Sequence, residues 1–164
     1  MDGTPQRRNA AMTPKVVDII TVGSGAAALS AALTAASEGA SVLILEKSDK
    51  LGGTTAMSGA GIWIPANHLA RAEGIEDSPE EALEYLRATA PEGWRDDEDA
   101  LWAAFTQAAP EALALIAEKT PLQFELTKEP DPMAEYAGGK DRGRMLSPGA
   151  IARSVAGPFG KHIR

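Results

Sequence analysis

Cysteine is absent from the 164 residues, and this absence removes several kinds of chemistry. Without thiols the chain cannot form disulfides, thiolate metal sites or a cysteine nucleophile. Histidine is also scarce: His68 and His162 lie far apart in the sequence, and neither has a partner at metal-ligand spacing. We therefore predict no metal site, and a cysteine-free chain of this kind favours a reducing compartment such as the cytoplasm.

Two further shortages limit the partners of the chain. Its 16 lysines and arginines are outnumbered by 23 acidic residues, which gives a formal net charge of -7 at pH 7. A nucleic-acid partner requires basic side chains that neutralise phosphates, so we expect none. No uninterrupted apolar run approaches the roughly 20 residues of a membrane-spanning helix, so we expect no stable membrane insertion.

The length and composition suit one packed domain of ordinary size. Hydrophobic residues make up 44% of the chain and charged residues 24%, close to the average for a globular protein. Residues 1–14 are polar and interrupted by Pro and Gly, and we interpret them as a disordered tail.

A βαβ unit is the clearest pattern in the sequence. Residues 16–22 are mostly β-branched and apolar, as in a parallel strand that is buried on both faces. An Ala/Leu-rich stretch follows and continues to Glu38, and Gly39 then provides a helix terminator. Residues 41–45 form a second compact apolar run, so the whole unit has the expected length of about 30 residues.

The loop between the first strand and the helix has the residues of a dinucleotide-binding turn. Gly23 permits the tight turn, Gly25 lets the backbone approach a pyrophosphate, and Ala28 replaces the third glycine of the fingerprint. The free amides near Ala26 and Ala27, together with the positive end of the helix dipole, favour an anion at this point.

An acidic residue stands where this fingerprint requires one. Glu46 ends the second strand, 23 positions after Gly23, close to the spacing of about 20 at which a carboxylate accepts hydrogen bonds from ribose hydroxyls. A carboxylate there also disfavours a 2′-phosphate. The alternative is an ordinary strand–turn–helix connection with a surface glutamate.

A second glycine loop favours FAD over NAD. Residues 52–55, Gly-Gly-Thr-Thr, bring the chain back toward the phosphates with two positions free of side chains and two hydroxyl groups. An ordinary nicotinamide-binding domain does not need this loop. Residues 58–65, Ser-Gly-Ala-Gly-Ile-Trp-Ile-Pro, then end it with bulky apolar side chains.

These segments together resemble the fumarate reductase/succinate dehydrogenase flavoprotein superfamily, and within it the 3-ketosteroid (3-oxosteroid) dehydrogenases. The resemblance implies an α/β fold with a Rossmann-like FAD-binding βαβ unit, a parallel sheet and a helical segment. It implies bound FAD, held by residues of both loops and by the end of the second strand. These residues are Gly23, Ser24, Gly25, Ala26, Ala27, Glu46, Lys47, Gly53, Thr54, Thr55, Ser58, Gly59, Ala60 and Gly61.

The middle of the chain has helical patterns. Ser78 is an N-cap candidate, followed by a proline at the first helical position and by a glutamate that fits a capping box, so we predict a helix to about Ala88. Residues 97–109 and 111–119 have the pattern of two more helices, with Pro110 as a break or as the first residue of the second helix.

The last part of the chain has weaker patterns. Apolar and polar residues alternate from Leu122 to Leu126, as in a strand with one wet face, and the residues from 130 onward are rich in turn signals. We place a FAD-binding domain with its helical segment at 15–120 and the start of a substrate domain at 121–164. Because members of the resembled group are much longer, we expect an incomplete N-terminal portion of a larger two-domain flavoprotein, which needs its C-terminal part.

The resemblance implies an FAD-dependent dehydrogenase that moves a hydride between a C–C bond next to a carbonyl and flavin N5. The substrate would be a small molecule, a 3-ketosteroid or another enone or carbonyl compound, with a fumarate reductase-like activity as the alternative. A truncated nucleotide-binding module without catalysis and a NAD(P)-linked reductase are further alternatives. No catalytic residue is assigned, because Pro132 and Met133 stand where the resemblance implies tyrosines and Tyr136 is out of register.

Overall fold

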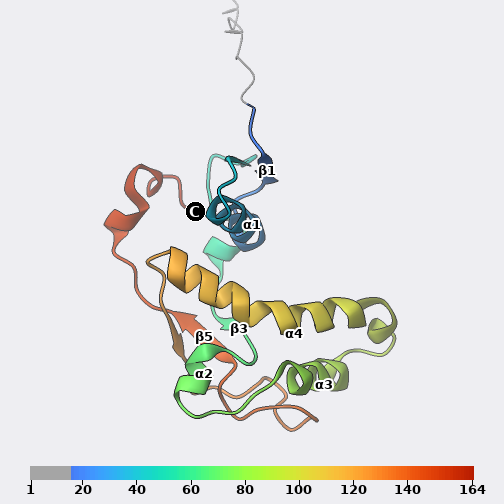
Figure 1. Ribbon diagram of the computed structural model, residues 1–164. Helices are drawn as coiled ribbons and strands as arrows, with labels where there is room; N and C mark the ends of the chain where they lie inside the picture. The colour runs from blue at the N-terminus through green and yellow to red at the C-terminus, as the bar shows by residue number, and fades with distance from the viewer. Residues whose placement is uncertain (1–15) are drawn as a thin grey trace, which may run out of the picture.

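Two separate sheets with helices around them make up residues 16–164, the part of the chain that the computed structural model describes (Figure 1). One sheet has two parallel strands and the other has three antiparallel strands. A long helix runs between the two halves and contacts helices of both. The predicted tail, residues 1–14, lies outside the described residues.

The predicted βαβ unit is confirmed. It consists of β1 (Ile19–Val22), α1 (Ala26–Ser37) and β2 (Val42–Leu45), and the two strands pair in parallel. The first strand is shorter than predicted, and the prediction that it is buried on both faces is wrong: Ile20 and Val22 are 54% and 81% exposed, because this sheet has only two strands in the described residues. Its pairing begins beside a local clamp, in which the Asp18 carboxylate accepts hydrogen bonds from both the backbone amide and the hydroxyl of Ser41.

The second sheet joins segments that are far apart in the sequence. Its strand order is β3 (Ile62–Trp63), β5 (Met145–Pro148) and β4 (Phe124–Leu126). The predicted alternation is present in β4, where only the central residue is exposed. The strands β3 and β5 were not predicted. Each of them depends on pairing with a distant strand that no local pattern reveals, and β3 has only two residues. The domain boundary near residue 120 stays a prediction, although β3 and β5 pair across it.

Two helices lie beside this second sheet. The first, α2 (His68–Ala72), is short and was not predicted. The second, α3 (Pro79–Thr89), confirms the predicted helix, because the Ser78 hydroxyl accepts a hydrogen bond from the Glu81 amide at 3.1 Å. The capping box is only half formed: the Glu81 carboxylate pairs with Lys140 at 2.8 Å instead of returning to the Ser78 amide.

The two helices predicted around Pro110 are one helix, α4 (Trp94–Lys119), so that prediction is wrong. Proline removes one backbone hydrogen bond from a helix interior but does not always end the helix. The buried residues Thr106, Ala109 and Leu113 lie on both sides of Pro110, so packing continues across it. By length and composition α4 could also cross a membrane. In this fold it lies between α1 and α3 and contacts both (Figure 1).

The end of the described chain returns to the βαβ half. A 3-10 segment, η2 (Arg153–Phe159), precedes the last residues. Ile163 then forms a parallel bridge to Leu51, and the Leu51 amide donates to His162 O at 2.6 Å. The last residues therefore lie beside the predicted second glycine loop.

Candidate functional site

The first glycine loop leaves the start of α1 open. Gly23 has a φ of 106°, which only glycine adopts readily, and its amide donates to Leu45 O at 2.6 Å. Gly25 is the N-cap of α1 and provides no capping side chain, and the first helical turn has no acidic residue. In the part of the chain that the structure describes, no acceptor bonds the amides of Ala27 and Ala28. These unpaired amides at a helix N-terminus are suited to an anion.

The second glycine loop folds onto the first. Gly52 has a φ of 105°, and a Cβ there would collide with the Cβ of Ala56. A Cβ on Gly53 would lie 3.5 Å from the Gly25 Cα, so the two backbones approach closely. The predicted proximity of the two loops in space is therefore correct, and glycine at 52 is required by the backbone itself.

A hydroxyl from the second loop reaches the helix start. The loop contains the short 3-10 helix η1 (Thr55–Met57), and Thr55 Oγ1 accepts a hydrogen bond from the Ala26 amide at 3.1 Å. A hydroxyl that accepts one bond still has its own proton to donate. Thr55 thus keeps a hydroxyl donor next to the open amides of α1.

Glu46 lies at the end of β2, as predicted, and both of its carboxylate oxygens are oriented by hydrogen bonds. Oε2 accepts from Ser24 Oγ at 2.5 Å, and Oε1 accepts from the Ser48 amide at 3.0 Å. The Ser24 hydroxyl, and after it the Ser48 amide, lowers the pKa of Glu46 below its ordinary value. Glu46 is therefore an ionised acceptor with lone pairs left for ribose hydroxyls.

These groups fit the adenine-nucleotide half of a flavin cofactor. The amides of α1 and the Thr55 hydroxyl have the chemistry of donors for phosphate oxygens, and the Glu46 carboxylate has that of an acceptor for ribose hydroxyls. A Cβ on Gly25 would lie 3.7 Å from Thr55 Oγ1, inside the space between the two loops. Glycine at position 25 keeps that space open.

The other predicted site residues show no side-chain contact that points to a cofactor in the part of the chain that the structure describes. No side-chain hydrogen bond from Lys47 or Thr54 occurs within the described residues. The Ser58 hydroxyl donates to Thr55 O at 2.8 Å and accepts from the Ala60 amide at 3.1 Å, so it shapes a turn. Residues 58–61 then lead into β3. A role for these residues at the cofactor stays a prediction.

The end of the described chain adds a residue that the sequence did not indicate. The Arg164 guanidinium lies 3.5 Å from Ser48 Oγ and 3.6 Å from Met57 Sδ. It therefore contacts the segment after Glu46 and the end of the second glycine loop. Arg164 is more than a hundred positions away from both contacts, so no motif could have assigned it.

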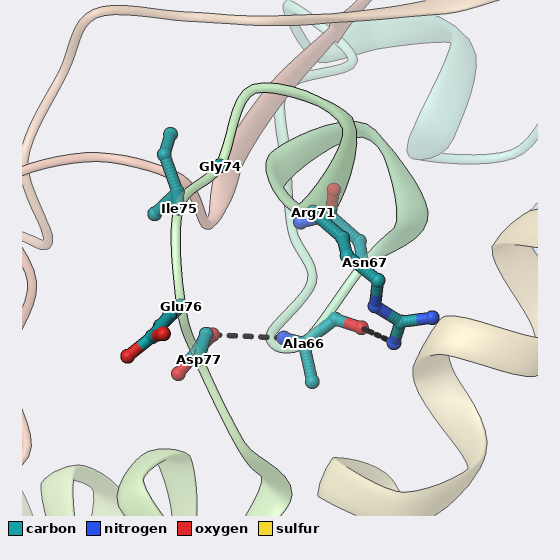
Figure 2. Close-up of a pocket in the computed structure, with 7 residues that line it drawn as sticks. All are labelled: Ala66, Asn67, Arg71, Gly74, Ile75, Glu76 and Asp77. Atoms are coloured by element: carbon teal, nitrogen blue, oxygen red, sulfur yellow. Dashed lines mark hydrogen bonds between the residues drawn. The ribbon is translucent and has the colours of Figure 1, made fainter.

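A cavity of about 300 Å³ lies elsewhere, in the half that contains α2 (Figure 2). It is lined by Ala66, Asn67, Arg71, Gly74, Ile75, Glu76 and Asp77. The main polar groups are used internally: Asp77 accepts from the Ala66 amide at 2.8 Å, and the Asn67 amide group donates to two backbone carbonyls. We assign no cofactor contact to this cavity.

The two stacked loops and the carboxylate after β2 place the chain among the dinucleotide-binding proteins with a Rossmann-type βαβ unit. Comparison with known proteins then gives the family. Residues 18–163 match the FAD binding domain family, so the chain belongs to that family, whose cofactor is FAD.

Several relatives are named as dehydrogenases of ring ketones, and another, 36% identical over 114 residues, is an NADH:fumarate oxidoreductase from Klebsiella pneumoniae, covering 70% of this chain and 12% of the relative. The chain is 38% identical over 131 residues to a 3-oxosteroid 1-dehydrogenase from Rhodococcus opacus, covering 80% of this chain and 25% of the relative. It is 43% identical over 137 residues to a 4-oxocyclohexanecarboxylate 2-dehydrogenase from Sinomonas cyclohexanicum. That match covers 83% of this chain and 24% of the relative.

A solved structure gives the same fold. The 3-ketosteroid delta1-dehydrogenase from Sterolibacterium denitrificans, in complex with 1,4-androstadiene-3,17-dione, aligns with a TM-score of 0.79 and 36% identity. The alignment covers 90% of this chain and 26% of that protein. The chain thus spans about a quarter of the length of these two ring-ketone dehydrogenases and of this solved structure.

Proposed function

We propose that this chain is the cofactor-binding portion of an FAD-dependent dehydrogenase that acts on a C–C bond beside a ring ketone. The observation that carries the proposal is the pair of stacked glycine loops at the start of α1, with Glu46 beside them. The names of the relatives support the reaction class, since both kinds oxidise a ring next to a carbonyl.

Each part of the site has a separate task in this proposal. The amides after Gly25 hold the pyrophosphate, and Thr55 adds a hydroxyl donor beside them. Glu46 accepts from the adenosine ribose, and its charge repels a 2′-phosphate. Bound FAD would supply the flavin N5 that exchanges a hydride with the substrate carbon. The catalytic acid and base would come from polypeptide that corresponds to the rest of the relatives, so turnover requires that part.

The substrate class we propose is a cyclic ketone, with 3-ketosteroids and smaller ring ketones as its two members. Both kinds of relative reach 43% identity, the oxocyclohexanecarboxylate enzyme over 137 residues and a steroid enzyme over 76 residues, so identity does not separate the two members. Pro132 and Met133 stand where tyrosines were expected for a steroid dehydrogenase, which favours testing a smaller ring.

The test is to purify the full-length protein, record its absorption spectrum, and measure turnover with an artificial electron acceptor. We expect flavin absorption bands, and oxidation of a 3-ketosteroid or of 4-oxocyclohexanecarboxylate. Flavin without turnover of either ketone would contradict the reaction class and support a non-catalytic module. Reduction of fumarate alone would support the fumarate reductase-like alternative. A colourless protein that binds no FAD would overturn the proposal.

A further inference from the structure

Ser24 is the polar residue that the predicted cofactor contacts explain least. Ser24 is only 3% exposed, although it lies in the middle of the first glycine loop. Its hydroxyl donates to Glu46 Oε2 at 2.5 Å and accepts from the Gly52 amide at 2.9 Å. Because a hydroxyl has one proton, Ser24 Oγ cannot also donate to a phosphate without releasing Glu46.

The two partners of Ser24 belong to different parts of the nucleotide site. Glu46 is the ribose acceptor at the end of β2. Gly52 begins the loop that lies against Gly25 and delivers Thr55 to the Ala26 amide. One buried hydroxyl therefore connects the ribose end of the site with the pyrophosphate end.

We propose that Ser24 is a positioning residue for the adenosine half of FAD: its hydroxyl aims the Glu46 carboxylate at the ribose and fixes the second glycine loop, without contacting the cofactor. This inference rests on the proposed cofactor site. Without the hydroxyl, the Glu46 carboxylate has one fewer hydrogen bond to hold its orientation, and the half-buried Gly52 amide loses its acceptor. Recognition of the ribose should then weaken more than recognition of the phosphates.

The experiment compares ADP with 2′-deoxy-ADP, because the difference in their affinities reports the ribose contact. Binding to the flavin-free full chain is measured by calorimetry for wild type, Ser24→Ala and Glu46→Gln, and for the Ser24→Ala/Glu46→Gln double variant. Ser37→Ala is the matched control, since it removes an exposed hydroxyl at the far end of α1 that bonds only Leu33 O. Thermal melting confirms that each variant is folded.

We expect wild type and Ser37→Ala to prefer ADP, and Ser24→Ala to lose most of that preference while ADP binding weakens about tenfold. In the Glu46→Gln background, Ser24→Ala should change the ADP/2′-deoxy-ADP ratio no further, because the two residues act as one unit. Should Ser24→Ala fail to fold, Ser24→Thr keeps the hydroxyl and should keep the wild-type ratio.

A wild-type ratio in Ser24→Ala, even with weaker overall binding, would overturn the inference, since a merely structural role moves both affinities together. A folded Ser24→Thr that loses the ratio would overturn it as well. Wild-type protein that binds neither ADP nor FAD would instead overturn the proposed function, so the two failures are distinguishable.

Discussion

The Arg144 guanidinium lies 2.6 Å from the Asp77 carboxylate, and their side chains are 0% and 2% exposed. The same guanidinium also bonds Asp131 at 2.9 Å and lies 5.3 Å from the centre of the Trp63 ring. Trp63 in turn donates to Asp131 at 2.7 Å. This buried network joins β3, the residue directly before β5 and two loops, so charge and hydrogen bonding, not only apolar packing, hold the half with the three-stranded sheet together.

Replacing Arg144 with leucine should destabilise the protein strongly. The change leaves two buried carboxylates without their cation, and breaking a buried ion pair in this way costs about 3–5 kcal/mol. Urea unfolding monitored by circular dichroism measures the loss. The matched control is Arg87→Ala, which removes another Arg–Asp pair, to Asp99, whose side chains are about one third exposed. The control should cost much less, because solvent screens an exposed ion pair. Equal losses in the two variants would contradict the central place of Arg144.

The network also predicts a loss of stability in acid. Burial by itself opposes ionisation of Asp77, but the hydrogen bonds from Arg144 and from the Ala66 amide outweigh it and lower the pKa of Asp77 below its ordinary value. A carboxyl with a lowered pKa in the folded state contributes stability above its unfolded pKa, and that contribution is lost as the pH falls through the folded value. Urea midpoints should therefore drop as the pH falls below the ordinary aspartate pKa.

The variant that tests this assignment is Asp77→Asn. It should be less stable than wild type at pH 7, and its urea midpoint should fall less on acidification because it has one titrating carboxyl fewer. An Asp77→Asn midpoint that falls as steeply as that of wild type would assign the acid sensitivity to other groups.

Gly52→Ala should disturb the second glycine loop. The residue has a φ of 105°, and the added Cβ would collide with Ala56, so both backbone strain and a steric clash oppose the change. We expect a loss of about 1–3 kcal/mol in stability and weaker FAD binding. Gly39→Ala is the control: Gly39 has a φ of 89° and open space around it, at the opposite end of α1. It should lower stability without changing FAD affinity, and a similar loss of FAD affinity in both variants would refute the local explanation.

Thr55→Val tests the hydroxyl at the helix start. Valine keeps the shape but leaves the Ala26 amide without its acceptor and removes a donor for phosphate. We expect FAD to bind about tenfold more weakly, as measured by quenching of its fluorescence. Thr34→Val removes a hydroxyl that bonds Ser30 O within α1, and its FAD affinity should equal that of wild type. Unchanged binding by Thr55→Val would remove Thr55 from the site.

The nucleotide half could be predicted from the sequence because its signals are local. The strand, the glycine turn, the helix stop at Gly39 and the acidic residue after β2 all lie within one continuous βαβ unit. The approach of the two loops also followed from sequence, since the second begins six residues after Glu46. The hydrogen bonds of Ser24 could not be predicted from the sequence, because its contacts with Glu46 and Gly52 depend on how the chain folds in three dimensions.

The half with the three-stranded sheet could be predicted only in part, because the residues that contact one another there are distant in sequence. The strand β3 has two residues and exists because β5 pairs with it. The continuous α4 depends on packing that spans Pro110, while the local signal of a proline indicates a break. Arg144 belongs to a turn-rich stretch, and nothing in that stretch indicates that its partners are Asp77 and Asp131.

The most direct test of the account is the FAD affinity of Gly25→Val, measured by titration of the flavin-free protein. Gly25 has φ −79° and ψ 177°, which other residues adopt without strain, so the substitution acts by filling the space between the loops. We predict tight binding of one FAD to wild type and no measurable binding to a folded Gly25→Val. Wild-type affinity in that variant would contradict the placement of the cofactor.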